Sequence, residues 1–148
     1  PLRDDRGRKA QVDDRVHCLS GDWSIRESMA FTQIADVVVG PETGILNAVS
    51  NEPMRKVVIL SHSTVNNLTR DWDNTASIWS ASTTCPGRGT NEALACHQLH
   101  YNWDHCQQAK TPDGQGTGVA QCQYDIPAEA VYDAISEALQ KLEEAQAA

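Results

Sequence analysis

Apolar and polar residues in the first part of the chain follow the order expected for alternating strands and helices. The apolar segments at 12–19, 37–39 and 56–60 have the length of strands, and the second is a β-branched run typical of a strand covered on both faces. Residues 25–35 and 43–50 instead carry apolar positions at helical spacing. This order predicts an α/β fold with a parallel sheet and right-handed crossovers.

The first predicted helix has a clear start. Ser24 and Glu27 have the spacing of a capping box, which satisfies free backbone N–H groups at a helix start. Ile25, Met29 and Ile34 are placed to form one stripe along the helix. The sequence therefore predicts a capped helix with one buried apolar stripe.

The second half of the chain lacks this regularity until its end. Residues 61–84 are rich in Ser, Thr, Asn and Asp, and residues 85–125 carry Cys, His, Gly and Gln without clear periodicity. Both segments predict loops. A last helix is predicted from Ile126, because Pro127 suits a first helical turn and apolar residues then recur on one face. This face consists of Val131, Ile135, Leu139 and Leu142.

Charge and hydropathy limit the partners of the chain. Its 148 residues carry a formal net charge of -8, with acidic residues spread along the length. This argues against binding to nucleic acid, which needs clustered Lys and Arg. No apolar run approaches the ~18 residues of a membrane span, so we expect a cytoplasmic protein with at most peripheral membrane association. The start at Pro1, without Met, leads us to expect an excised or truncated piece of a longer chain.

Polar loops follow all three predicted strands, at residues 21–24, 40–44 and 61–64. In an open parallel sheet, ligands bind beyond the carboxyl ends of the strands. Because the three strands are predicted to run in one direction, these loops should share one rim of the sheet. The sequence therefore predicts a ligand site at this rim, although each loop could also be an ordinary turn without a ligand.

The middle loop has the most distinctive chemistry. Gly40 and Gly44 would let a ligand approach the backbone, and Thr43 could cap the next helix or donate its hydroxyl to a phosphate. Free N–H groups at that helix start also favour a phosphate. Glu42 would repel a phosphate but accepts hydrogen bonds from hydroxyl groups. This combination indicates a nucleotide sugar, and the alternative is a plain turn with Thr43 as the helix cap.

The other two loops offer weaker candidates. Trp23 could stack on a nucleotide base or cover the site, or it could be a packing residue. Ser61, His62 and Ser63 could contact an acceptor or a phosphate, or form a simple turn after the strand. The residues alone assign no catalytic group.

The segment 21–48, followed by the strand at 56–60, resembles the C-terminal domain of the heptosyltransferase-like glycosyltransferases (family 9, GT-B fold). In that family a strand ends in an Asp-Thr-Gly element followed three residues later by His, and the element's backbone holds the diphosphate of the nucleotide sugar. The resemblance places Glu42, Thr43 and Gly44 at this element and Asn47 at the His position. Trp23 falls where the family places a residue against the base.

The resemblance implies that the chain is the donor-binding part of a glycosyltransferase. The donor would be a nucleotide sugar, and we expect an ADP-sugar. The transferred sugar would be a heptose. The acceptor would be a glycan or a lipid-linked, lipopolysaccharide-type molecule, and no further cofactor would be required. The family's catalytic carboxylate lies in an N-terminal Rossmann-like domain, which this chain lacks, so we expect no transfer by these residues alone.

Two alternatives remain beside this interpretation. Asn47 in place of His, together with the missing domain, would fit a non-catalytic accessory module of GT-B ancestry. Another GT-B enzyme, such as a nucleotide-sugar epimerase, would have a similar phosphate loop. In each case the chain is interpreted as a single partial domain, with a Rossmann-like nucleotide-sugar-binding core at 12–63, a loop-rich Cys/His region at 64–125 and a C-terminal helix at 126–148.

Four cysteines in the second half, with three nearby histidines, could bind zinc, form disulfides or stay as thiols. Structural zinc sites usually contain a close ligand pair, and the gaps between successive cysteines here are much longer. Zinc is therefore less favoured than the other two states together. The residues concerned are Cys85, Cys96, Cys106 and Cys122, with His97, His100 and His105.

Overall fold

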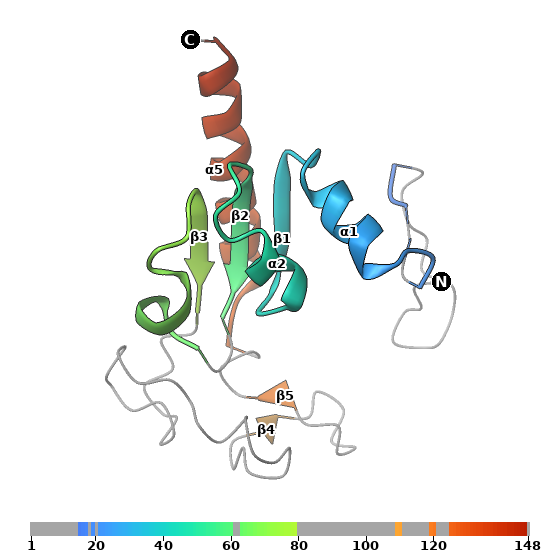
Figure 1. The fold of residues 1–148 in the computed structure, drawn as a ribbon. Coiled ribbons are helices and arrows are strands. Elements are labelled where there is room, and N and C mark those ends of the chain that lie inside the picture. The colour runs from blue at the N-terminus through green and yellow to red at the C-terminus, as the bar shows by residue number, and fades with distance from the viewer. Residues whose placement is uncertain are drawn as a thin grey trace.

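The computed structural model describes residues 15–17, 19, 21–60, 63–79 and 125–147, together with the backbone of residues 109–110 and 119–120. Helices and strands follow one another along the chain as shown in Figure 1. They are α1 (Ile25–Thr32), β1 (Val37–Pro41), α2 (Gly44–Ala48), β2 (Arg55–Ile59), the π-helical turn η1 (Val65–Thr69), β3 (Thr75–Ile78), β4 (Ala109–Lys110), β5 (Val119–Ala120) and α5 (Ala128–Ala147).

A small open sheet of three parallel strands forms the centre of the fold. Its order is β1-β2-β3, and β4 and β5 form a separate antiparallel pair. Val39 of β1 pairs with Val57 of β2, which in turn pairs with Ala76 of β3. The chain therefore has an α/β fold consistent with part of a Rossmann-like sheet, and the predicted parallel pairing of the strands near 37–39 and 56–60 is confirmed.

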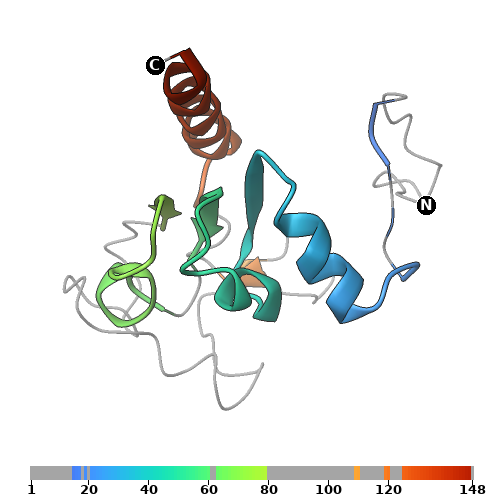
Figure 2. The same cartoon turned by 45° about the horizontal axis from the view of Figure 1, so that its top comes forward.

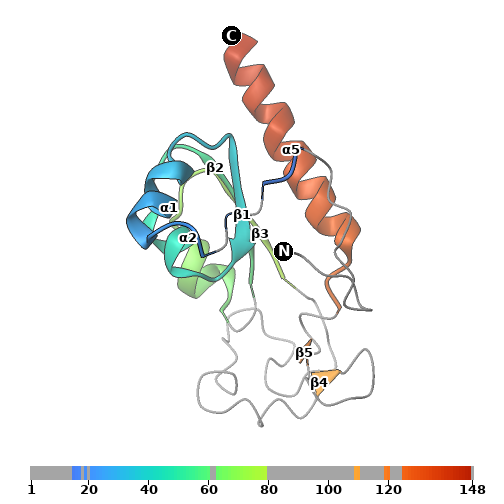
Figure 3. The same cartoon turned by 90° about the vertical axis from the view of Figure 1, so that its right-hand side faces the viewer.

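Helices cover both faces of this sheet. α5 contacts all three strands from one side, whereas α2 and η1, which connect β1 to β2 and β2 to β3, lie on the other side (Figures 2 and 3). Val57 and Val58, neighbours on the central strand, are both fully buried. Because successive strand residues point to opposite faces, this double burial agrees with a sheet covered on both sides.

The hydrophobic core lies between β2 and the two connecting segments. Val58 and Leu60 are fully buried and pack with Leu46 of α2. Partly buried apolar side chains extend this cluster toward β1, η1 and the start and end of β3: Val38, Leu68, Trp72 and Trp79. The core thus ties the first residue beyond β2 to the helix that follows β1.

The predicted C-terminal helix is confirmed, and the residues of its apolar face differ in burial. α5 follows Pro127, whose carbonyl accepts a hydrogen bond from the Ala130 N–H at 3.1 Å. Ala138 is buried in α5, whereas Leu139, one of the apolar residues predicted to share a face, is 42% exposed. A small side chain lets the helix approach the sheet closely, which is why Ala138 occupies the contact. The other predicted face residues are half-buried: Val131, Ile135 and Leu142.

The predicted first strand at 12–19 is not formed by its described residues. Residues 15–17 and 19 have no strand conformation, and Val16 and Leu19 are exposed. The third strand of the sheet is instead β3, which lies in a segment predicted to be a loop. An apolar run becomes a strand only where a neighbouring strand pairs with it, and β2 pairs with β3 through four residue pairs.

The helix α1 has the predicted start but not the predicted buried stripe. Ser24 N–H donates to Glu27 Oε2 at 2.8 Å, and Glu27 N–H donates to Ser24 Oγ at 3.3 Å, which confirms the capping box. Ile25 and Ile34 are 61% and 80% exposed, and α1 ends at Thr32. α1 contacts α2 rather than lying across the sheet, so most of its surface stays in solvent.

No helix in the described part of the chain is long and apolar enough to cross a membrane.

Candidate functional site

All three parallel strands end at the same level. Pro41 pairs with Ile59, and Ile59 pairs with Ile78, so the last residues of β1, β2 and β3 stand side by side. The segments that follow β1 and β2 therefore leave the sheet at one rim (Figure 1). This is the place where open parallel sheets bind ligands, and it confirms the predicted meeting of two of the three loops.

A partly buried hydrogen bond joins these two loops. The Ser63 N–H donates to Glu42 Oε1 at 3.2 Å, across a separation of 21 residues in the chain. Ser63 is buried, and the second carboxylate oxygen of Glu42 is buried as well. Glu42 therefore positions the loop after β2 and does not present its carboxylate freely to solvent.

The loop after β2 is also fixed from its other end. Thr64 donates two hydrogen bonds to Asn67 Oδ1, from its N–H at 2.6 Å and from its hydroxyl at 2.9 Å. Thr64 is buried and directly precedes η1. Sequence reasoning missed both residues, although Thr followed three residues later by a side chain with an amide oxygen is a variant of the capping-box spacing.

The start of α2 is the open part of the rim. Thr43 is the N-cap residue with an extended backbone, yet its side chain makes no capping hydrogen bond and is exposed. A Cβ placed on Gly44 would meet no atom within 4 Å. A ligand can therefore reach the backbone here, next to a free hydroxyl and the first-turn N–H groups of the helix. Since α2 has only five residues, local hydrogen bonds matter more here than a helix dipole.

Gly40 has a packing reason to be glycine. A Cβ at this position would lie 3.3 Å from Leu46 Cδ1, tighter than most real contacts. Leu46 belongs to the buried core, so a larger residue at 40 would push α2 away from the sheet. The absence of a side chain at Gly40 is thus explained without any ligand, unlike the absence at Gly44.

Asn47 is engaged within its own helix. Its Nδ2 donates to the carbonyl of Thr43 at 2.9 Å, and its backbone N–H donates to the same carbonyl at 3.0 Å. The side chain therefore reinforces the first turn of α2. An amide in this position supplies no proton in the physiological pH range.

Trp23 makes an aromatic contact within its own segment. Its ring centroid lies 4.9 Å from that of Phe31, with the rings inclined at 59°. The side chain is 36% exposed, so this contact leaves part of the ring accessible. α1, which Trp23 precedes, begins toward the end of the sheet where the strands end (Figure 1). The structure thus gives Trp23 a packing role and leaves stacking on a base as a prediction.

Several predicted site residues lie outside the described residues. They are Ser61, His62, Cys85, Cys96, Cys106 and Cys122. Within the described ranges, no group of three or more His, Cys, Asp or Glu side chains is arranged to hold a metal ion. The zinc, disulfide and thiol alternatives for the cysteines stay predictions.

The opposite end of the sheet contains a buried cation that the sequence did not single out. Lys56 is fully buried, and its Nζ donates to the carbonyls of Glu52 at 2.6 Å and Met54 at 2.9 Å. Burial lowers the pKa of its ammonium group, against the opposing charges of Asp73 and Glu52. Lys56 closes the turn before β2 and takes no part in the rim.

Among the described residues, the rim presents groups that can bind an anion. Its carboxylate, Glu42, is hydrogen-bonded to a backbone amide, and its open groups are the Thr43 hydroxyl and the backbone at Gly44. These groups could donate hydrogen bonds to an anion. No known protein family, curated protein or solved structure matches the chain.

Proposed function

We propose that this chain is the donor-binding part of a nucleotide-sugar-dependent glycosyltransferase with the GT-B fold. The loop from Glu42 to Gly44 would hold the diphosphate, and the partly exposed ring of Trp23 would lie against the base. The acceptor would be a glycan or a lipid-linked molecule, and the catalytic base would belong to an N-terminal Rossmann-like domain.

The observation that best supports this proposal is the Glu42–Ser63 hydrogen bond beside the open start of α2. It holds the loops after β1 and β2 together at the rim, while Gly44 leaves the backbone accessible. A site in which one loop is fixed and the neighbouring backbone is open needs little rearrangement on binding, which favours affinity.

The charge of Glu42 would repel a phosphate at Gly44, and the hydrogen bond from the loop after β2 weakens this repulsion. One carboxylate oxygen accepts the Ser63 N–H, which stabilises the charged carboxylate in place. The diphosphate would be bound by the Thr43 hydroxyl and by backbone N–H groups of the first turn, as at other strand–helix junctions.

Calorimetric titration of the chain with ADP, UDP, GDP and CMP tests this proposal. We expect at least one nucleoside diphosphate to bind, and Gly44→Val to weaken that binding at least ten-fold. Because a Cβ at Gly44 meets nothing in the free protein, this variant should keep its thermal stability. Absence of binding by all four nucleotides would remove the basis for a donor site.

Ala48→Val is the matched control. It places the same β-branched side chain in the same short helix, at an exposed position away from the loop. We expect nucleotide binding close to that of the unchanged chain. Equal loss of binding in both variants would mean that Gly44→Val acts by disturbing α2 and not by blocking a ligand.

The second candidate is a non-catalytic binding module of the same ancestry. Asn47 favours it, because its amide is bound to the Thr43 carbonyl where the resembling enzymes have a titratable His. Asn47→His would separate the two functions once the chain is joined to a catalytic domain. A gain in sugar transfer without a change in nucleotide affinity would indicate a module that has lost catalysis.

A further inference from the structure

A pocket of about 250 Å³ lies at the end of the sheet opposite the rim. Its walls are the first residues of β2 and β3, including Arg55 and Thr75, and the middle of α5, including Ala134 and Lys141. The nucleotide-sugar site proposed above uses the carboxyl ends of the strands, so this pocket is a separate place on the molecule.

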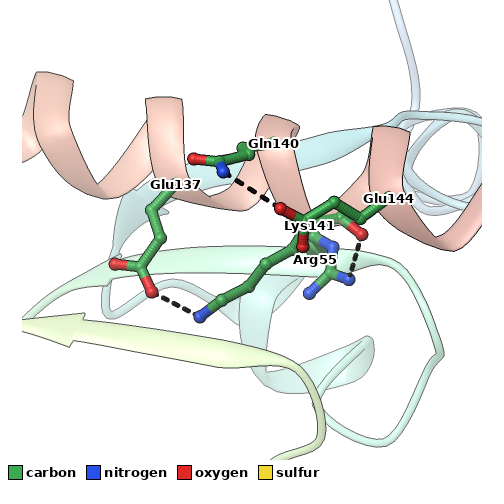
Figure 4. A network of polar contacts seen from close by, with 5 residues as sticks. All are labelled: Arg55, Glu137, Gln140, Lys141 and Glu144. Carbon is green, nitrogen blue, oxygen red and sulfur yellow. Dashed lines mark hydrogen bonds and ion pairs between the residues drawn. The ribbon is translucent and has the colours of Figure 1, made fainter.

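Arg55 is the charged group at the inner wall of this pocket. It is half-buried, and its Nη2 donates to the carbonyl of Lys141 in α5 at 2.9 Å (Figure 4). Its Nε is buried and has no hydrogen-bond partner, and among the described residues Arg55 forms no ion pair. A guanidinium offers five donors in a planar fork, so most of this group's capacity is unused.

The other charges at the pocket leave one positive charge uncompensated. Lys141 pairs with Glu137 one helical turn away, and both side chains are more than half exposed at the mouth (Figure 4). Arg55, Lys56 and Lys141 bring three positive charges to the lining, and Glu137 brings one negative charge. Glu137 pairs with Lys141, and the carboxylates of Asp73 and Glu52 act on the charge of Lys56. Among the described residues, this leaves the charge of Arg55 without a paired carboxylate. The ammonium of Lys56, which also lines the pocket, already donates to two backbone carbonyls.

The rest of the lining combines two polar residues, Asn74 and Thr75, with three alanines. Ala76 of β3 and Ala134 and Ala138 of α5 occupy positions where larger side chains would fill the space. Pockets for drug-sized ligands begin at about 300 Å³, and the volume of this pocket is slightly smaller. A ligand that fits is therefore smaller than a nucleotide and has a short hydrocarbon part.

We propose that this pocket binds a small organic monocarboxylate. The planar carboxylate would receive parallel hydrogen bonds from the Arg55 guanidinium, which suits this geometry better than an ammonium does. The hydrocarbon part would lie against the alanines. A single negative charge balances Arg55, whereas a dianion such as phosphate would be repelled by Glu137 at the mouth.

Amide NMR titrations of the full ¹⁵N-labelled chain with sodium propionate test this proposal, with inorganic phosphate and sodium chloride at equal ionic strength for comparison. Propionate should cause saturable shifts at Ala76, Ala134 and Ala138, with a dissociation constant on the order of 1 mM. Shifts identical to those in sodium chloride would overturn the proposal. Tighter binding of phosphate than of propionate would exclude a monocarboxylate site.

Two variants and their controls make the result specific. Arg55→Gln should weaken propionate binding at least ten-fold, whereas Arg70→Gln, at an exposed arginine paired with Asp71, should not.

Ala134→Val keeps every charge but narrows the pocket, and should weaken propionate binding at least five-fold. The control for it is Ala145→Val, at an exposed position of the same helix. Unchanged affinity in Ala134→Val would place the carboxylate outside this pocket.

Discussion

A charged side chain is held by hydrogen bonds at each end of the parallel sheet, fully buried at the amino end and half-buried at the carboxyl end. At the amino end, Lys56 donates to carbonyls two and four residues earlier in the chain. At the carboxyl end, Glu42 accepts a hydrogen bond from Ser63, 21 residues later. The first arrangement closes a local turn, whereas the second exists only when β1 and β2 are paired in register.

This difference separates what maintains the fold from what shapes the candidate site. The carbonyl groups of the turn before β2 accept hydrogen bonds from a residue close in the chain, so this turn needs no ligand. The loops at the rim are joined by a hydrogen bond between distant segments. A change at either loop therefore alters the surface that a ligand would meet. Substitutions of Lys56, near the start of β2, and of Leu60, directly after its end, compare the two ends of the sheet.

The largest effect on stability is expected in the hydrophobic core, directly after β2. Leu60→Ala removes a fully buried side chain that packs with Leu46 and Val58, and should lower the free energy of unfolding by about 3 kcal/mol. Urea denaturation measures this loss. Leu139→Ala, at an exposed leucine of α5, should cost less than about 1 kcal/mol. Equal losses would mean that the core is not centred on Leu60.

The next largest effect is expected at the amino end. Lys56→Met keeps the volume of the side chain but leaves the carbonyls of Glu52 and Met54 without the ammonium donor, at a cost of about 2 kcal/mol in the free energy of unfolding. Chemical denaturation at pH 7 tests this value. A more stable Lys56→Met protein would show that burying the charge costs more than its two hydrogen bonds return.

The stability difference between the unchanged protein and Lys56→Met should also depend on pH. Burial lowers the folded-state pKa of Lys56 below its ordinary value of 10.5, so in the interval between them the unfolded chain binds more protons. The stability of the unchanged protein, relative to Lys56→Met, should therefore rise as the pH increases through this interval. A relative stability that falls toward pH 10.5 would contradict the assigned direction.

A smaller effect is expected from the contact between the rim loops. Glu42→Ala removes the acceptor of the buried Ser63 N–H and should destabilise the protein by about 1–2 kcal/mol. Glu42→Gln keeps an acceptor oxygen and should cost less than about 1 kcal/mol. Denaturation of both variants distinguishes the hydrogen bond from the charge, and equal losses would assign the effect to the charge.

The smallest effect is expected at the exposed start of α1. Ser24→Ala removes the N-cap and should lower the free energy of unfolding by about 1 kcal/mol at most. Hydrogen bonds from Ser24 lower the pKa of Glu27, so the folded state loses this contribution as the pH falls through the folded pKa. The difference between the two proteins should narrow in acid, as denaturation at pH 7 and pH 3 will show.

Sequence patterns predicted those elements whose causes are local. The capping box at Ser24, the strands around 37–39 and 56–60, and the helix after Pro127 were all recognised, because propensity and periodicity act within a few residues. The strand β3 was missed because its four half-buried residues gain their conformation from pairing with β2. The predicted strand at 12–19 failed for the converse reason, since its described residues pair with no strand.

The candidate site was predictable as a place but not as an arrangement. The loop at 40–44 and its position at the rim followed from strand order. The roles of its residues did not, because Gly40 is explained by a contact with Leu46 and Glu42 by a contact with Ser63. Each partner comes from a different element, so no spacing in the sequence indicates it.

By itself, then, the sequence determined the capping box of α1, the apolar segments of β1 and β2 and their parallel order, because these depend on residues close together in the chain. Only the tertiary structure decided which strand completes the sheet, which face of α5 is buried and how the rim loops are joined. These features depend on free energies of pairing and burial between distant segments, which exist only after the chain has folded.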